Sequence, residues 1–180
     1  MAVQIGAKPD SGFDDPIGML KDCHRRIEHF LDILCLVAER AQNRNLTEEE
    51  RSAVKAALQY FHVGGERHIL DEEESLFPRL LAIAPTESND VLARLKRDHG
   101  DANDLHASVD WLYTTWISAG TLGGSEQAAL LAQTISLKRL YADHILVEEA
   151  EVFPHAALAL DNRSLTEMGR EFSSRRKSTS

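Results

Sequence analysis

Two stretches of the sequence place a histidine and a glutamate four residues apart in hydrophobic surroundings. The first is HILDEEESLFP, from His68 to Pro78, and the second is HILVEEAEVFP, from His144 to Pro154. Imidazole and carboxylate groups are costly to bury without a partner, and both are common ligands of transition metals. The repeated pattern therefore indicates either a buried ion pair in each copy or a metal site.

The repeat extends to the segment that precedes each copy. The chain reads LKDCHRRI around His24 and LKRDHGDA around His99. These two histidines are 75 residues apart, close to the 76 residues that separate His68 from His144. We interpret the chain as two copies of one helical hairpin, with a histidine on the first helix and His-x-x-x-Glu on the second.

Helical periodicity places all of these residues on core-facing stripes. In both copies the apolar residues and the His-x-x-x-Glu pair follow the same spacings of 4, 3, 4, 3, 4 and 4 residues, and residues three and four apart share a helix face. An unpaired buried carboxylate costs several kcal/mol, whereas a metal centre satisfies every group. The candidate metal ligands are His24, His68, Glu72, His99, His144 and Glu148.

The donor set narrows the choice of metal. Imidazole with carboxylate suits iron, zinc, copper or nickel better than magnesium or calcium. The usual zinc motifs, HExxH and paired CxxC, are missing, and six ligands are too many for one tetrahedral zinc. Two glutamates from opposite helices can bridge two ions, and inward carboxylate–histidine motifs in bundle cores are a known di-iron architecture.

The elements that must position these residues are long helices, because no alternating strand pattern of useful length occurs. We predict an all-α fold, an up-down-up-down four-helix bundle with a short fifth helix at the C-terminus. The predicted helices cover about 15–43, 47–78 with a kinked continuation to 84, 87–119, 125–153 or 160, and 164 onward.

Capping signals set the predicted helix starts. Thr47 with Glu50, and Ser164 with Glu167, match capping boxes, and Ser125 is the expected cap of the fourth helix. Gly64-Gly65 inside the second helix indicates a local bend or a close approach, because the periodicity resumes in phase beyond the pair.

One domain accounts for nearly the whole chain. We predict a bundle over residues 15–176, a flexible N-terminus over 1–14 and a disordered tail over 177–180. The basic cluster Arg175-Arg176-Lys177 is interpreted as a solvated, frayed terminus.

Composition excludes several partners. The 180 residues carry a net charge of −9, which argues against a nucleic-acid partner. The richest apolar run is too short to span a membrane, and the N-terminus has no apolar region typical of a signal peptide. Cys23 and Cys35 would lie ~18 Å apart along one helix, too far for a disulfide. We therefore expect a cytoplasmic protein.

The combined pattern resembles the hemerythrin-like, or HHE, domain family. The matching residues are His24, His68-x-x-x-Glu72, His99 and His144-x-x-x-Glu148, with Phe-Pro after each pair. The opening DPIGML at residues 15–20 and the closing Met168-Gly169-Arg170 are also similar to the family, so the resemblance covers about residues 15–176.

The resemblance implies a four-helix bundle that holds two non-haem iron ions joined by an oxo or hydroxo bridge. By this resemblance Glu72 and Glu148 bridge the two irons. The histidine ligands would be His24 with His68 on one iron and His99 with His144 on the other. The implied partner is a small diatomic or peroxide ligand.

Two positions depart from the oxygen-carrying hemerythrins. Those carriers have a further histidine where this chain has Asn103, so reversible oxygen carriage is less expected and one iron keeps a more open position. Their fourth-helix carboxylate corresponds to Glu149, but we favour Glu148 because its spacing matches the first repeat. The arrangement is similar to family members linked to nitric oxide or peroxide stress, iron–sulfur cluster repair or sensing.

Other residues lie near the candidate ligands in the sequence. We expect Glu28, Glu73 and Glu149 to be solvated or to lie beside the ligands. Tyr141 faces inward, for core packing or with its hydroxyl near the metals.

Two kinds of aromatic residue are expected to lie apart from the ligands. His62 is about 120° from the ligand face and should not ligate. Trp111 and Trp116 are expected to be core residues or contacts in a homodimer.

The function predicted from these observations is the binding or reduction of O2, peroxide or NO, in stress defence or iron-centre repair. Two alternatives stay open. One is a redox- or oxygen-sensing or metal-binding interaction module without turnover. The other is a structural bundle with a vestigial or zinc-filled site.

Overall fold

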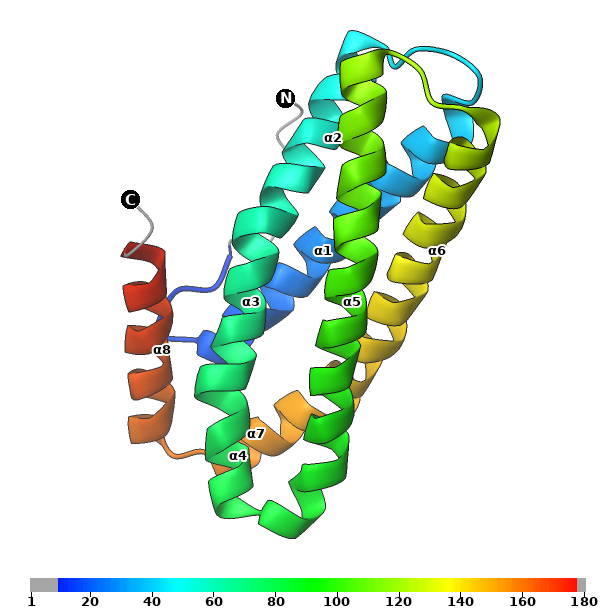
Figure 1. Cartoon of the computed structure of the whole chain (residues 1–180). Coiled ribbons are helices and arrows are strands. Elements are labelled where there is room, and N and C mark those ends of the chain that lie inside the picture. The colour runs from blue at the N-terminus through cyan, green and yellow to red at the C-terminus, as the bar shows by residue number, and fades with distance from the viewer. Residues whose placement is uncertain (1–9, 178–180) are drawn as a thin grey trace.

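Long helical rods form the described part of the computed structural model, residues 10–177, and no strand occurs in that range (Figure 1). The first rod is α1 (Pro16–Arg40). The second runs without a break through α2 (Glu48–Tyr60), η1 (Phe61–Gly65), α3 (Glu66–Leu70), η2 (Asp71–Leu76) and α4 (Phe77–Ile83). The third is α5 (Pro85–Ala119). The fourth runs through α6 (Gly124–Val147), η3 (Glu148–Val152) and α7 (Phe153–Ala159), and α8 (Asn162–Lys177) follows.

The four long rods pack into a bundle. Contacts join α1 to α2 and α6, and α5 to α4 and α6. Figure 1 shows α8 lying against one side of this bundle, and its contacts are with η2 and α1. The all-α class predicted from periodicity and the predicted additional C-terminal helix are confirmed.

The caps at the helix starts agree with the prediction at α2 but not at α6 or α8. The capping box at the start of α2 is confirmed, because the Glu50 amide donates to Thr47 Oγ1 at 3.2 Å and the Thr47 amide donates to Glu50 Oε2 at 2.9 Å. The capping box predicted from Ser164 and Glu167 was wrong, because Asp161 caps α8 by accepting from the Ser164 amide at 2.8 Å. Ser125 is likewise not a cap, because α6 begins one residue earlier.

Helix ends follow local backbone geometry. The predicted break over residues 84–86 is confined to Ala84, with φ −136° and ψ 71°, and α5 begins directly at Pro85, where proline's fixed φ suits a first helical position. The first helix ends at Arg40 rather than at residue 43, and Asn43 takes a positive φ of 58° in the loop. A Cβ on Gly64 would lie 2.6 Å from the Tyr60 ring, so the predicted close approach is found there.

The apolar core divides into two clusters, and the predicted ligands lie between them on every rod. One cluster includes Ile27, Phe61, Ala102 and Tyr141, and the other includes Leu20, Leu76, Leu95 and Val152. His24 falls between Leu20 and Ile27, and the other rods repeat this order. The bundle therefore has a polar layer enclosed by apolar side chains at both ends.

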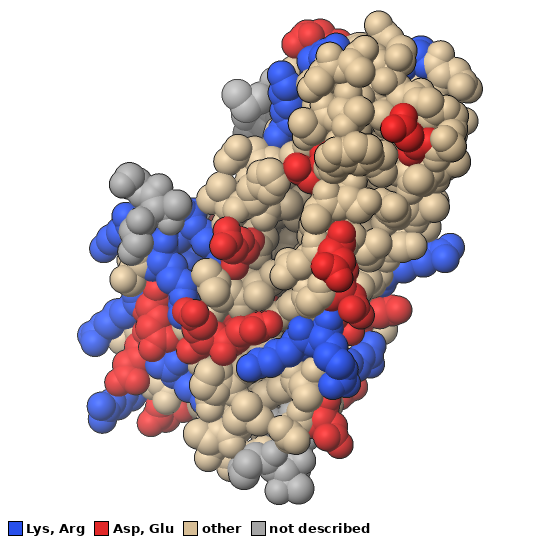
Figure 2. Space-filling view, viewed as in Figure 1, with Lys and Arg blue, Asp and Glu red and all other residues tan. Residues whose placement is uncertain are grey.

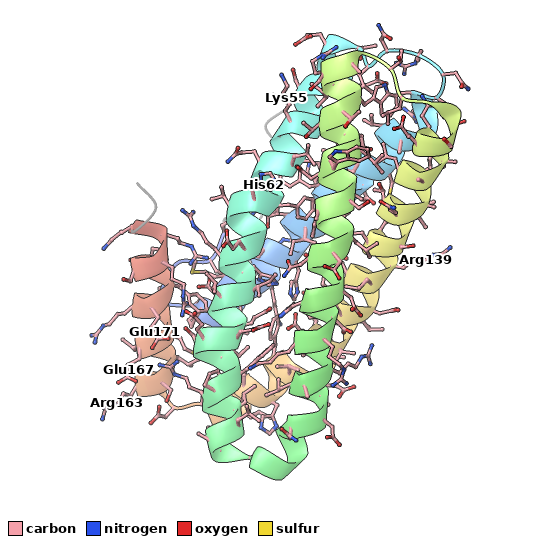
Figure 3. The ribbon with its side chains drawn as sticks, viewed as in Figure 1. Lys55, His62, Arg139, Arg163, Glu167 and Glu171 are labelled. Carbon is pink, nitrogen blue, oxygen red and sulfur yellow. The ribbon has the colours of Figure 1, made fainter. Side chains whose placement is uncertain are left out.

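The C-terminal helix is held by a buried ion pair. Asp71 is fully buried in η2 and accepts hydrogen bonds from Arg175 Nη1 at 2.8 Å and from Arg176 Nη2 at 2.7 Å. Arg79 adds a two-pronged contact with Glu171 at 2.8 and 3.0 Å; Glu171 lies on α8 in Figure 3. The prediction that Arg175 and Arg176 are solvated was wrong, because an unpaired Asp71 would be costly.

The ends of the chain fall partly outside the described range. Residues 1–9 and 178–180, which belong to the segments predicted to be flexible or disordered, lie outside the described residues. Within the described range, the Ser11 amide donates to the buried Asp22 carboxylate at 2.5 Å, and Phe13 passes over Gly169 of α8. The N-terminal segment is thus attached to both α1 and α8.

Replacing Gly169 by alanine should lower the melting temperature by several degrees. The added Cβ would overlap the Phe13 carbonyl oxygen, a backbone atom, and such overpacking costs about 1–3 kcal/mol. The matched control is Gly100→Ala on α5, where a Cβ meets no atom within 4 Å, and roughly 0.5–1 kcal/mol of stabilisation is expected there. Thermal unfolding by circular dichroism of both variants, each prepared free of metal, measures the difference; equal melting temperatures would contradict it.

Two further expectations concern thiols and membranes. Cys23 and Cys35 are both buried free thiols, as their separation on α1 requires, and burial raises the pKa of each. No helix among residues 10–177 is long and apolar enough to cross a bilayer.

Candidate metal centre

The polar layer brings the six predicted ligands together. Each is between 0% and 4% exposed, although each is a histidine or glutamate. They come from all four rods: His24 from α1, His68 and Glu72 from the second rod, His99 from α5, and His144 and Glu148 from the fourth. The equivalent residues of the two sequence repeats therefore meet in one buried layer.

Two sets of atoms within this layer could each hold one ion, and Glu72 belongs to both. The first set is His24, His68, Glu72 and Glu148, and the second is Glu72, His99 and His144; within each set the candidate ligand atoms lie within 4.8 Å of one another. The histidine pairing is the one implied by the family resemblance.

The two glutamates lie between the histidines of the two sets. Glu72 Oε1 is 3.2 Å from His68 Nε2, and its Oε2 is 3.3 Å from His99 Nε2. Glu148 Oε2 is 3.1 Å from His24 Nε2 and 3.4 Å from His144 Nε2. Each carboxylate thus faces one histidine from each set, which is the placement a bridging ligand needs.

Carboxylates outside the layer accept hydrogen bonds from two of the four imidazoles, and a further carboxylate lies near a third. His24 Nδ1 donates to Glu149 Oε1 at 2.8 Å, and His99 Nδ1 donates to Glu73 Oε1 at 2.7 Å. His144 Nδ1 lies 3.5 Å from Asp98. A proton held on Nδ1 leaves the Nε2 lone pair free for a metal, and such outer partners are typical of metal-binding histidines.

Aromatic rings pack against His24 and His99, the histidines on the first helix of each hairpin. The Phe153 ring stacks on His24, with centroids 5.3 Å apart, and the Phe77 ring lies parallel to His99 at 6.2 Å. These are the phenylalanines of the two Phe-Pro motifs. Each motif therefore fixes a histidine that belongs to the opposite hairpin.

Wider helical turns allow two consecutive glutamates to approach the histidines of the layer. The π-helical segments η2 and η3 begin at Asp71 and Glu148. On a regular α-helix consecutive residues point about 100° apart, whereas a π segment widens the turn and often marks a functional site. Glu72 and Glu73 can then both serve the layer, as can Glu148 and Glu149.

Burial and neighbouring charges together set the pKa values of the layer. Burial lowers the pKa of His68 well below its usual value and also lowers that of His99. Burial and the neighbouring charge of Glu148 raise the pKa of Glu72. For Glu148 burial acts in the same direction, but the close His144 and His24 imidazoles outweigh it and lower its pKa. Two carboxylates in one dry site ionise together only if cations are close.

Unpaired atoms give a direct test of whether a metal fits. His24 Nε2 and both oxygens of Glu72 and of Glu148 are buried without a hydrogen bond of acceptable geometry. His99 Nε2 and His144 Nε2 face each other at 3.2 Å, so the pair needs a proton or a cation between the two lone pairs. Buried polar atoms are nearly always satisfied in proteins. The donor set therefore fits metal ions.

The structure separates the residues whose roles were left open. Glu28 is exposed and lies apart from the layer. Glu73 and Glu149 are 31% and 42% exposed, but each holds an imidazole Nδ1. Their signal in the sequence was the Glu-Glu doublet that follows each histidine by four residues.

The aromatic residues differ in how well they match their predicted positions. The Tyr141 hydroxyl donates to His106 Nε2 at 3.1 Å rather than entering either ligand set. His62 is 61% exposed and pairs with Asp110 at 3.1 Å, so it lies apart from the ligands as predicted (Figure 3). Trp116 is buried as expected, whereas Trp111 is 59% exposed, so the core interpretation of Trp111 was wrong.

Removing the outer carboxylates should weaken metal binding. Glu73→Ala and Glu149→Ala leave an Nδ1 proton without its acceptor and free the ring to rotate, and loss of such partners typically costs about 10–100-fold in metal affinity. Titration with a metal-sensitive dye measures the change. Glu151→Ala, an exposed residue of the same η3 segment, is the control; a loss in that variant as large as in Glu149→Ala would contradict the assignment.

Comparison with known proteins agrees with the donor set. A model of the hemerythrin HHE cation binding domain matches residues 15–156. An uncharacterized protein of Haemophilus influenzae (strain ATCC 51907 / DSM 11121 / KW20 / Rd) is 27% identical over 171 residues, or 92% of each chain. The matched range of the domain model includes all six inward residues and ends within α7, before α8 begins.

Proposed function

Because the chain belongs to the hemerythrin HHE cation-binding domain family, we propose that it is a non-haem di-iron protein that binds or reacts with a small oxidant. His24 and His68 hold one iron, and His99 and His144 hold the other. Glu72 and Glu148 bridge the pair. O2, peroxide and NO are the proposed ligands, and the proposed setting is stress defence or iron-centre repair in the cytoplasm.

The observation that supports this proposal best is the set of unpaired buried atoms on Glu72 and Glu148. Four carboxylate oxygens in a fully buried layer are unfavourable unless cations or donors meet them. The imidazole Nε2 atoms that surround them carry lone pairs wherever Nδ1 donates outward. Two divalent or trivalent ions with histidine and carboxylate ligands satisfy all of these groups, and iron suits this donor set.

The chain's own residues supply position, charge and exclusion of water. When bound, iron supplies an ion that changes oxidation state in contact with a small oxidant. Glu73 and Glu149 keep a proton on Nδ1 of His99 and His24 and so hold their rings in place. The apolar clusters above and below the layer limit the access of water, which strengthens electrostatic interactions in it.

The finer points of the architecture belong to the same proposal. We include the up-down-up-down order of the four rods, which is supported by the α1–α2 and α5–α6 loops at one end of the bundle and the α4–α5 corner at the other (Figure 1). A homodimer is also proposed, and the exposed Trp111 is the residue that supports it.

Reduction followed by exposure to each ligand tests the function. The iron-loaded protein is reduced with dithionite under argon and mixed separately with O2, hydrogen peroxide and NO, while the visible spectrum is followed. A rapid change with at least one reagent, with the spectrum restored by further reduction, is expected. A protein loaded with iron but inert to all three would contradict the proposal.

A sensing role without turnover is a second candidate, supported by the position of α8. Arg175 and Arg176 bind Asp71, which directly precedes the proposed ligand Glu72. A change at the metals could therefore reach α8 through one residue. Limited proteolysis distinguishes the two roles: a sensor predicts that cleavage within α8 differs between the reduced and oxidised protein, and equal cleavage rates would contradict it.

A further inference from the structure

A pocket of about 580 Å³ lies beside the polar layer, between the second rod and α5. Its lining includes Gly65, Asn103 and Tyr141, and each of these residues precedes or follows a predicted ligand by one helical turn. Gly65 is three residues before His68, Asn103 is four after His99, and Tyr141 is three before His144. One turn is about 5.4 Å along a helix, so three rods place the pocket next to the layer.

Tyr141 joins the pocket to the layer. Its side chain is almost completely buried, and its ring meets the His144 ring edge-on with centroids 6.5 Å apart. Its hydroxyl donates to His106 Nε2, which also lines the pocket. The Phe61 ring packs on His106 at 4.5 Å and forms part of the wall. Tyr141 therefore contacts both the pocket and the His144 ring.

The lining has a distinct chemistry. Leu58, Phe61, Ile69, Leu70 and Ala107 make the walls largely apolar, and Glu66 and Asp110 are its acidic groups. His62 is paired with Asp110, and burial lowers the pKa of His106 to about 4, so that His106 is uncharged near neutral pH. Figure 2 shows acidic side chains around the hollowed middle of this face. Carboxylates at an entrance repel anions, whereas apolar walls accept uncharged molecules.

We propose that this pocket admits and binds a small uncharged ligand of the metal centre, of the class of O2, NO or hydrogen peroxide, and rejects small anions. The inference rests on the proposed function and adds the route and the charge of the ligand. Tyr141 and His106 form the polar end of the pocket, where the Tyr141 hydroxyl oxygen can accept a hydrogen bond. The walls hold the ligand, and Glu66 and Asp110 select against negative charge.

Filling the pocket should slow ligand entry without disturbing the metals. Ala107→Phe places a large ring in the lining, and the association rate of NO with the reduced iron-loaded protein should fall about tenfold or more, within the range of rate changes seen among variants of one binding site. Ala132→Phe fills a second pocket of about 530 Å³ between the α1–α2 loop and α6 and is the matched control. Iron content and melting temperature are measured on both variants.

Removing the acidic groups tests the charge selection. In the double variant Glu66→Gln/Asp110→Asn, the association rate of azide, an anion, should rise several-fold at low salt, and the gain should shrink at high salt as screening increases. The rate for NO should stay within about twofold of wild type, because an uncharged molecule is not steered. Equal changes for azide and NO would overturn the charge selection.

A readout independent of iron separates this inference from the proposed function. Dissolved O2 is paramagnetic and broadens the NMR signals of nearby protons. In the zinc-loaded full-length chain, O2 should broaden the ring signals of Phe61, His106 and Tyr141, and Ala107→Phe should suppress this effect. Rates and broadening unchanged in Ala107→Phe would overturn the pocket while leaving the di-iron proposal intact. A wild-type chain that binds no iron but shows the broadening would overturn only the di-iron proposal.

Discussion

Replacing either His68 or Glu148 by alanine is expected to remove most of the iron from the purified protein. Each side chain belongs to a set of candidate ligand atoms within 4.8 Å of one another, so each substitution removes a candidate ligand. Because metal binds the folded chain, the loaded wild type should also be more stable than the metal-free form by about 2.7 kcal/mol when free metal is at 100 times its dissociation constant. Both variants should lose this increment.

Metal analysis with paired melting curves measures the effect. Iron per chain is determined after reconstitution, and melting temperatures are compared with and without metal. His62→Ala and Glu28→Ala change the same residue types at exposed positions, and both should keep the iron and the stability increment. Iron contents of His68→Ala and Glu148→Ala equal to those of the controls would mean that the layer is a structural ion-pair network.

The second large effect concerns the attachment of α8. The double variant Arg175→Met/Arg176→Met leaves the Asp71 carboxylate buried without its cationic partners. Breaking a buried ion pair by removing one side costs about 3–5 kcal/mol. For a chain of this length the melting temperature should fall by roughly 6–20 °C, with α8 the first segment to become sensitive to protease.

A third substitution separates the ion pair from simple packing. Adding Asp71→Asn to the double variant removes the buried charge, so part of the lost stability should return. The matched control is Arg163→Met, on the same helix (Figure 3), where the partner Glu167 is exposed and an exposed pair contributes only about 0–1 kcal/mol. If Asp71→Asn gave no recovery, the attachment of α8 would depend on contacts other than the buried charge.

The sequence predicted the inward residues well because periodicity and burial act through the same geometry. The stripe that contains Leu20, His24 and Ile27 needs only regular α-helix to face the core, and the structure buries all three. The repeat then supplied the equivalent residues on the other rods. These parts of the layer depend on spacing alone, which a sequence displays directly.

The sequence left open whether the outer carboxylates are solvated or lie beside the ligands, because their position depends on a change in helical turn. Regular periodicity turns Glu73 about 100° away from Glu72, but the π segment brings it to His99 Nδ1. The same holds for Glu149 and His24. Only the doublet repeated in both copies hinted at this.

The ion pairs that attach α8 to Asp71 were not predicted, for a different reason. A basic cluster near a chain end is usually solvated, and its partner lies about a hundred residues earlier in the sequence. The repeat contained a usable signal: Asp71 stands where the second copy has Val147. An acid in place of an apolar residue inside a buried stretch requires a cation, and Arg175 and Arg176 supply it.

The most direct test of the di-iron account is the metal content of the freshly purified wild-type protein. Iron and zinc per chain are measured by mass spectrometry, and the visible spectrum is recorded before and after dithionite. About two irons per chain, as a pair of shared-carboxylate sites requires, with absorption that dithionite bleaches, is the predicted result. No iron, or a single zinc, after anaerobic reconstitution with ferrous iron would contradict it.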